Sequence, residues 1–372
     1  MSKRRPKSGV GLADYSFVLP LVAALAAVAF FVSFYATFGR CLRPSLVACD
    51  APRFTPLFAA MKAWQAGTTL GALAEGEVLR GNTYQGHLVW ALCTGLYFLA
   101  FAAAVAVGLY VMRRSLADYP RARRWVPAAA AAASAAFAVL MHAFQAAPRE
   151  VPDLWTQLVE ATVKDDVRNI TEVYLWHDAL GFGMVLLLAC ASATTLVFPA
   201  NVRNFPAGRD ERAVRRLALR RLGSQAASLR LILYAGTSFL VVATLRLSSL
   251  LHWGLSYLQP TPSNAKDAAF VYKNIYGMVT SVVTAQGAFY TLLLISVYVP
   301  AALVINRRAH AYYVPARKAP SERKPESEGE EEKASAGAPP YALPVSQQLL
   351  RIAAILGPLL AGPLGELLGS LK

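Results

Sequence analysis

Four histidines are the residues of this sequence best suited to metal or redox chemistry. Each lies near one end of a different apolar segment, at comparable depth: His87, His142, His177 and His252. Imidazoles from neighbouring helices of a bundle can ligate a metal ion or the axial positions of haem. No His-x-x-x-His pair places two of them on one helix face, and histidine also packs well at a membrane interface. We therefore expect no cofactor, with haem or a metal ion as the alternative interpretation.

Arg246 is the one residue of fixed charge well inside an apolar segment. An arginine that faces lipid is costly, so we expect its guanidinium to face the interior of a helical bundle and to find a partner there. The candidate partners are Glu172, Asp178 and helix carbonyls. In that position Arg246 could bind an anion or line a pore. Alternatively, its side chain extends to the outer interface, about two helical turns away.

Two cysteines, Cys41 and Cys49, fall in a short connector that we place outside the membrane. In an oxidising compartment they could form a disulfide that closes this loop. The alternative is two unrelated thiols, and the spacing does not decide between the two interpretations.

Several motifs of known enzymes and transporters are missing from the sequence. There is no glycine-rich phosphate loop with a lysine, no His-Glu-x-x-His and no serine nucleophile elbow. No Asp or Glu lies deep in an apolar segment, which argues against a transporter that couples to protons or sodium through a midplane carboxylate. We therefore favour a protein that is not an enzyme.

The elements that must position these residues are membrane-spanning helices. Of the 372 residues, 56% are hydrophobic and only 16% are charged, whereas a soluble domain carries about a quarter charged residues. The apolar residues form runs of about 20, which match the thickness of the bilayer hydrocarbon. We therefore predict an all-α, polytopic membrane bundle over residues 1–310. Its six transmembrane helices are predicted at about 16–38, 87–112, 125–145, 177–199, 229–251 and 276–305.

The net charge of +15 follows this topology. Most of the 37 Lys and Arg residues flank the predicted spans on one side, as the positive-inside rule requires if both termini are cytoplasmic. The alanine- and arginine-rich composition is typical of bacteria, so we place the chain in the plasma (bacterial inner) membrane. Basic patches interleaved with aromatic residues are absent, and we expect no nucleic-acid partner.

The C-terminal region changes composition twice. Residues 311–344 are rich in Pro, Glu and Lys and have no apolar face, which predicts a disordered linker. Residues 345–372 form an amphipathic apolar segment that is broken by Gly357-Pro358 and Gly362-Pro363. We expect it to lie on the membrane, to re-enter it, or to dock in a groove of a protein partner. The docking candidates recur at helical spacing: Leu349, Ile352, Leu356, Leu359 and Leu360.

These observations support several hypotheses about function. The leading one is a non-enzymatic membrane protein that acts as an oligomeric pore, channel or membrane effector with a regulatory cytoplasmic tail. Small residues over 128–138 would allow close helix contacts in a homo-oligomer within the lipid bilayer. The first alternative is a haem- or metal-binding redox protein that uses the four histidines. The second is a membrane sensor or scaffold that recruits a cytoplasmic protein partner through its C-terminal segment.

Overall fold

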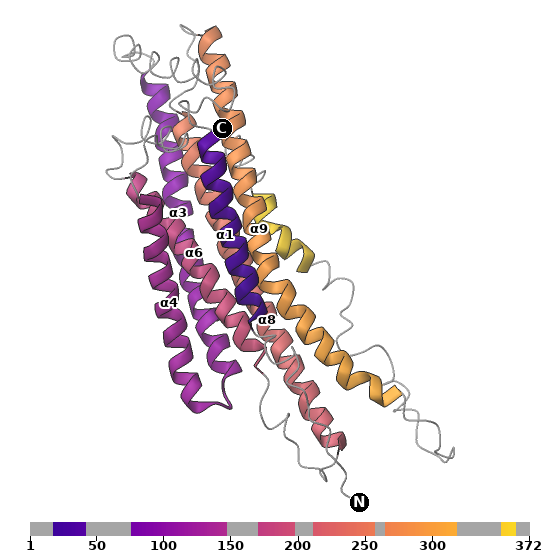
Figure 1. Cartoon of the computed structure of the whole chain (residues 1–372). Helices are drawn as coiled ribbons and strands as arrows, with labels where there is room; N and C mark the ends of the chain where they lie inside the picture. The colour runs from indigo at the N-terminus through magenta and orange to yellow at the C-terminus, as the bar shows by residue number, and fades with distance from the viewer. Residues whose placement is uncertain are drawn as a thin grey trace, which may run out of the picture.

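The structure, a computed structural model, describes residues 18–41, 76–146, 170–197, 211–256, 265–317 and 351–361. Within these ranges every regular element is an α-helix and no strand is present. The helices lie side by side in an elongated bundle (Figure 1). Their bounds are α1 Leu19–Cys41, α3 Gly76–Ser115, α4 Pro120–Ala146, α6 Ile170–Thr195, α8 Glu211–Ser256 and α9 Ala265–Arg317, followed by a tail helix at Arg351–Ala361.

Five of these helices are long and apolar enough to cross a membrane, as in a multi-pass membrane protein. Their candidate spans are Gln85–Ser115, Pro120–Phe144, Glu172–Thr195, Leu217–Ser256 and Ile275–Ala309. The described apolar part of α1, Leu19–Phe30, is shorter than a span. The predicted total of six spans therefore stays a prediction, although α1 itself is a 23-residue helix.

Sequence chemistry explains where several helices begin and end. Pro120 starts α4, a position at which its missing N–H and fixed φ are tolerated. The arginine-rich residues 211–230 are continuous with the fifth predicted span, since both belong to α8. Helix α9 continues to Arg317 and so runs past residue 311, where the linker was predicted to start.

Helices α6, α8 and α9 bury the largest shares of their candidate spans and form the centre of the bundle. Helix α3 packs mainly on α8, α4 packs on α6, and α1 lies against α9 and α6. The close approach of α4 and α6 depends on Gly183, because a Cβ there would lie 2.7 Å from the Ser134 carbonyl oxygen. Side chains of α3, α6, α8 and α9 fill the largest apolar core.

One end of the bundle, which we call the basic end, joins the ends of α3 and α6 to the starts of α4 and α8. Arg221 of α8 lies 2.8 Å from the Asp118 carboxylate and donates to the Ser115 carbonyl at 3.2 Å. Arg308 of α9 donates to the Leu196 carbonyl at 2.6 Å. These bonds fix the interhelical turns at the end that the charge pattern assigns to the cytoplasm, an assignment that stays a prediction.

The tail helix packs between α8 and α9 near the middle of their candidate spans (Figure 1). Thr237 of α8 donates its hydroxyl to the Ala354 carbonyl at 3.0 Å. A Cβ on Gly287 of α9 would lie 2.5 Å from the Pro358 carbonyl oxygen, so the two backbones are in direct contact. Ala361, the last described residue, is fully buried. The tail helix is therefore seated in a groove of its own bundle.

Candidate functional site

Arg246 lies on α8, two to three turns before the helix ends, and its side chain is only 3% exposed. Its guanidinium carbon is 5.2 Å from the ring centroid of Tyr97 on α3 and 5.7 Å from that of Tyr174 on α6. Both distances fit cation–π contacts, which are strong where water is excluded. The guanidinium thus faces the bundle interior. We call this group, with His177 and Asp178 of α6, the arginine cluster.

An acidic side chain lies near the buried cation. Asp178 lies within electrostatic range of Arg246, and the Tyr174 hydroxyl donates a hydrogen bond to it. The other candidate partner, Glu172, instead lies 3.1 Å from Nε2 of His142. In the described part of the chain Nε of Arg246 has no hydrogen-bond partner, so the guanidinium keeps one buried donor unused. An unused donor on a buried cation is costly, and it is a common property of binding sites.

Tyr97 connects α3 to α6 within the cluster. Its hydroxyl donates to the backbone carbonyl of His177 at 2.7 Å, while Nδ1 of His177 bonds to the carbonyl of Val173. Tyr290 of α9 also lies within electrostatic range of Arg246 and Asp178, and it hydrogen-bonds to Gln286. Helices α3, α6, α8 and α9 therefore all contribute to this polar group inside an otherwise apolar bundle.

The other three predicted histidines have separate surroundings. His87 stacks on Trp253 at a ring distance of 4.8 Å, and His142 stacks on Trp176 at 3.9 Å. Nδ1 of His252 bonds to the Ser248 carbonyl at 2.8 Å. The structure does not bring the four imidazoles together. Among the described residues no group of three or more His, Cys, Asp or Glu side chains is placed to hold a metal ion.

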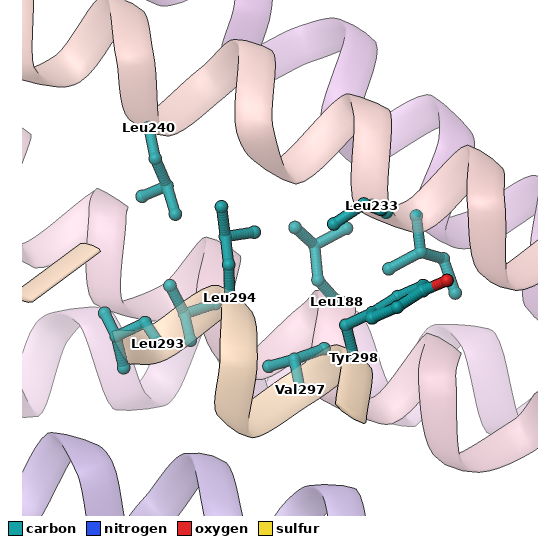
Figure 2. A pocket seen from close by; sticks show the side chains of 9 residues that line it. Leu188, Leu233, Leu240, Leu293, Leu294, Val297 and Tyr298 are labelled. Carbon is teal, nitrogen blue, oxygen red and sulfur yellow. The ribbon is translucent and has the colours of Figure 1, made fainter. Parts of the chain in front are cut away.

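Next to the arginine cluster, towards the basic end, lies a narrow apolar slit (Figure 2). Leucines of α6, α8 and α9 point towards one another across it, and its volume is only about 10 Å³. That is the space of at most one water molecule, and the walls offer it no polar partners except at Tyr298. The slit is lined by Val185, Leu188, Ile232, Leu233, Leu240, Leu293, Leu294, Val297 and Tyr298.

Beyond Tyr298 a much larger cleft opens between α8, α9 and the tail helix, with a volume of about 560 Å³. We call it the basic cleft, because Arg230 of α8 and Arg351 of the tail helix both line it. Both guanidiniums lie within electrostatic range of the Tyr298 hydroxyl. Asn306 adds an amide, and most of the remaining lining is apolar, including Leu229, Leu303, Ile305, Ile352 and Ile355.

The remaining predicted residues are placed as follows. Cys49 and Leu349 lie outside the described residues, as does the side chain of Cys41, so the predicted disulfide is not described. Ile352, Leu356 and Leu360 form the exposed face of the tail helix, and Leu359 is half-buried. The groove is contacted instead through the face that carries Ala354, Pro358 and Ala361.

Sequence reasoning identified Arg246 but missed most of its surroundings. Tyr97 lies in an apolar, aromatic-rich run and carries no signal that separates it from a lipid-facing tyrosine. The basic cleft was also missed, since Arg230 and Arg351 are 121 positions apart in the sequence. Comparisons with protein-family models, curated proteins and solved structures find no match to this chain. The conclusion that the geometry supports is therefore an architecture: a helical bundle with five helices suited to cross a membrane.

Proposed function

We propose that the protein is a non-enzymatic membrane channel for small anions, in a closed state, with the tail helix as its regulatory element. The observation that carries the proposal is Arg246, a nearly fully buried cation with an unused Nε donor inside the bundle. A cation at such a depth is costly to maintain and most often marks the path of an ion or substrate. Arginine is also the side chain that anion pores use.

The order of sites along the central helices supports a path. On α8 the sequence runs from Arg246 through Leu240 and Leu233 of the slit to Arg230 of the basic cleft. At the helical rise, Leu240 is about 9 Å and Arg230 about 24 Å from Arg246 along the axis. A cationic site, an apolar constriction and a second cationic site thus follow one another along α8.

The slit has the properties of a closed hydrophobic gate. Constrictions lined by leucine and valine block ions because water leaves them, and a small widening restores conduction. A volume of about 10 Å³ leaves no room for a hydrated ion. In this proposal the gate opens when α8 and α9 separate, and the tail helix is the element that bears on both of them.

Three parts of the proposal rest on the sequence alone: a homo-oligomer, the bacterial inner membrane and cytoplasmic termini. The two alternative functions have less support. A haem or metal site would need two or more of the histidines to face one group, and the four have separate neighbours. A scaffold would recruit its partner through the exposed face of the tail helix, which carries Ile352, Leu356 and Leu360, whereas the opposite face already packs on α8 and α9.

The experiment that tests the proposal is halide flux in proteoliposomes that contain the full chain. Replacing Leu293, which is 1% exposed in the slit, by Asn should wet the gate and raise anion flux about tenfold. The matched control is Leu292→Asn on the same turn, where the leucine is 48% exposed and outside the slit. Unchanged flux in folded Leu293→Asn protein contradicts the proposal.

Two further measurements define selectivity and the tail. Adding Arg246→Met to Leu293→Asn should remove the preference for anions, because the buried positive potential is lost. Ending the chain at Pro340 should change the membrane potential of expressing cells if the tail helix regulates the gate. A truncated chain that behaves like the full chain removes the regulatory role and leaves the pore to be judged by the flux variants.

A further inference from the structure

The basic cleft brings together two guanidiniums from segments far apart in the sequence. Arg230 extends from α8 and Arg351 from the first turn of the tail helix, and both lie near the Tyr298 hydroxyl. Nε of Arg230 donates to the Ala226 carbonyl at 3.4 Å, whereas Nε of Arg351 is buried without a hydrogen-bond partner among the described residues. Several N–H donors of the two side chains are therefore available to a ligand.

No carboxylate in the described part of the chain forms an ion pair with either arginine. Two like charges that share a partly apolar cleft repel each other, and the low dielectric of the walls increases that repulsion. An anion between them would remove the penalty. Phosphate fits this role best, because its oxygens accept paired N–H bonds from the planar guanidinium fork.

The walls and the size of the cleft indicate what carries the phosphate. A volume of about 560 Å³ far exceeds that of an inorganic ion and suits a headgroup with part of its glycerol and chains. Leucine and isoleucine side chains of α8, α9 and the tail helix line it beside the arginines. The cleft also lies towards the basic end, within the last turns of the candidate span of α9, where headgroups would lie.

We propose that the basic cleft binds the phosphate of an anionic phospholipid between Arg230 and Arg351. Because one arginine belongs to α8 and the other to the tail helix, the bound lipid holds the tail helix in its groove. Lipid binding and tail docking are then coupled, and each strengthens the other by the same factor. The proposal extends the regulatory role of the tail, but its readout is bound lipid rather than ion flux.

The test uses the full chain in detergent with defined lipids, and native mass spectrometry to count retained lipid. We expect phosphatidylglycerol to be retained and phosphatidylcholine to be lost. Arg230→Gln and Arg351→Gln should each lower phosphatidylglycerol retention about tenfold. Arg351→Lys should give an intermediate value, because it keeps the charge but loses the fork. The matched control is Arg307→Gln, an exposed arginine of the same end that does not line the cleft.

Each outcome decides a part of the proposal. Equal retention by the wild type, the cleft variants and Arg307→Gln overturns it. Inorganic phosphate that raises the melting temperature as much as phosphatidylglycerol overturns the lipid source and keeps the phosphate site. Circular dichroism confirms that the variants remain helical, and Arg351 lies outside the spans that build the bundle. Retained lipid together with unchanged ion flux in folded Leu293→Asn protein would refute the channel and leave this site standing.

Discussion

The arginine cluster and the basic cleft both place positive charge in apolar surroundings, but the neighbours of that charge differ. In the cluster one cation has a carboxylate, two aromatic faces and almost no exposed surface. In the cleft two cations share an open space and no described carboxylate balances them. The first site has an acidic side chain and aromatic rings of its own around the cation, so a ligand must displace a protein group before it can bind. The second is unbalanced, so an anion can bind without any rearrangement of charge.

This difference agrees with the two roles that we propose. A closed path needs a cation whose charge is masked until the helices move, and Asp178 can provide that mask for Arg246. A regulatory site needs to respond to the membrane in the closed state, which the open cleft allows. The comparison therefore predicts that substitutions in the two sites differ in the size of their effect and in its dependence on the lipid.

The largest effect is expected at Arg246. Arg246→Met leaves the Asp178 carboxylate buried without its cation, which should lower the free energy of unfolding by about 3 kcal/mol. The measurement is the unfolding free energy in bicelles by steric trapping. The double variant Arg246→Met/Asp178→Asn should recover much of the loss, since replacing a whole buried ion pair is often neutral. A double variant as unstable as the single one would show that the two charges are not coupled.

The next effect concerns the groove between the two sites. Gly287→Ala places a methyl group 2.5 Å from the Pro358 carbonyl oxygen. This overpacking against the backbone should weaken docking of the tail helix by about 2 kcal/mol. A cysteine at position 361, in a chain without native cysteines, should then react about tenfold faster with a water-soluble maleimide. Gly277→Ala is the control on the same helix, because its Cβ meets no atom within 4 Å. Equal labelling in both variants would contradict the docked position of the tail helix.

A smaller effect is expected at the hydroxyl that joins α3 to α6. Tyr97→Phe removes the hydrogen bond to the His177 carbonyl but keeps the aromatic face over Arg246, so the loss should be about 1 kcal/mol. Tyr110→Phe is the control, since among the described residues its hydroxyl bonds only to Arg114, at 3.4 Å on the exposed surface. Differential melting of the two variants in one detergent measures the contrast. Equal melting temperatures would place the Tyr97 hydroxyl outside the stabilising contacts of the cluster.

The sequence predicted the helical architecture because apolar runs of bilayer length have few alternative structures. Five of the six predicted spans coincide with helices long and apolar enough to cross a membrane. The burial of the Arg246 side chain was also predictable, because a charge inside such an apolar run must face the interior of the bundle. Its neighbours were not, because helix rotation and interhelical pairing decide which of many tyrosines meets the cation. The pairing of Arg230 with Arg351 depends on where the tail helix packs, which local periodicity does not determine.

The smallest stability effect, and the sharpest contrast with Arg246, is expected at Arg351. In zwitterionic lipid Arg351→Gln removes a repelling charge from the basic cleft, so the unfolding free energy should change by less than about 0.5 kcal/mol. In phosphatidylglycerol the wild type should gain stability from bound lipid. A tenfold weaker affinity of Arg351→Gln for this lipid should reduce that gain by about 1.4 kcal/mol. Arg246→Met should be equally destabilising in both lipids, because its charge is balanced within the protein. The same lipid dependence in both variants would mean that the two arginine sites do not differ in how their charges are balanced. The basic cleft would then bind an anion no more readily than the arginine cluster does.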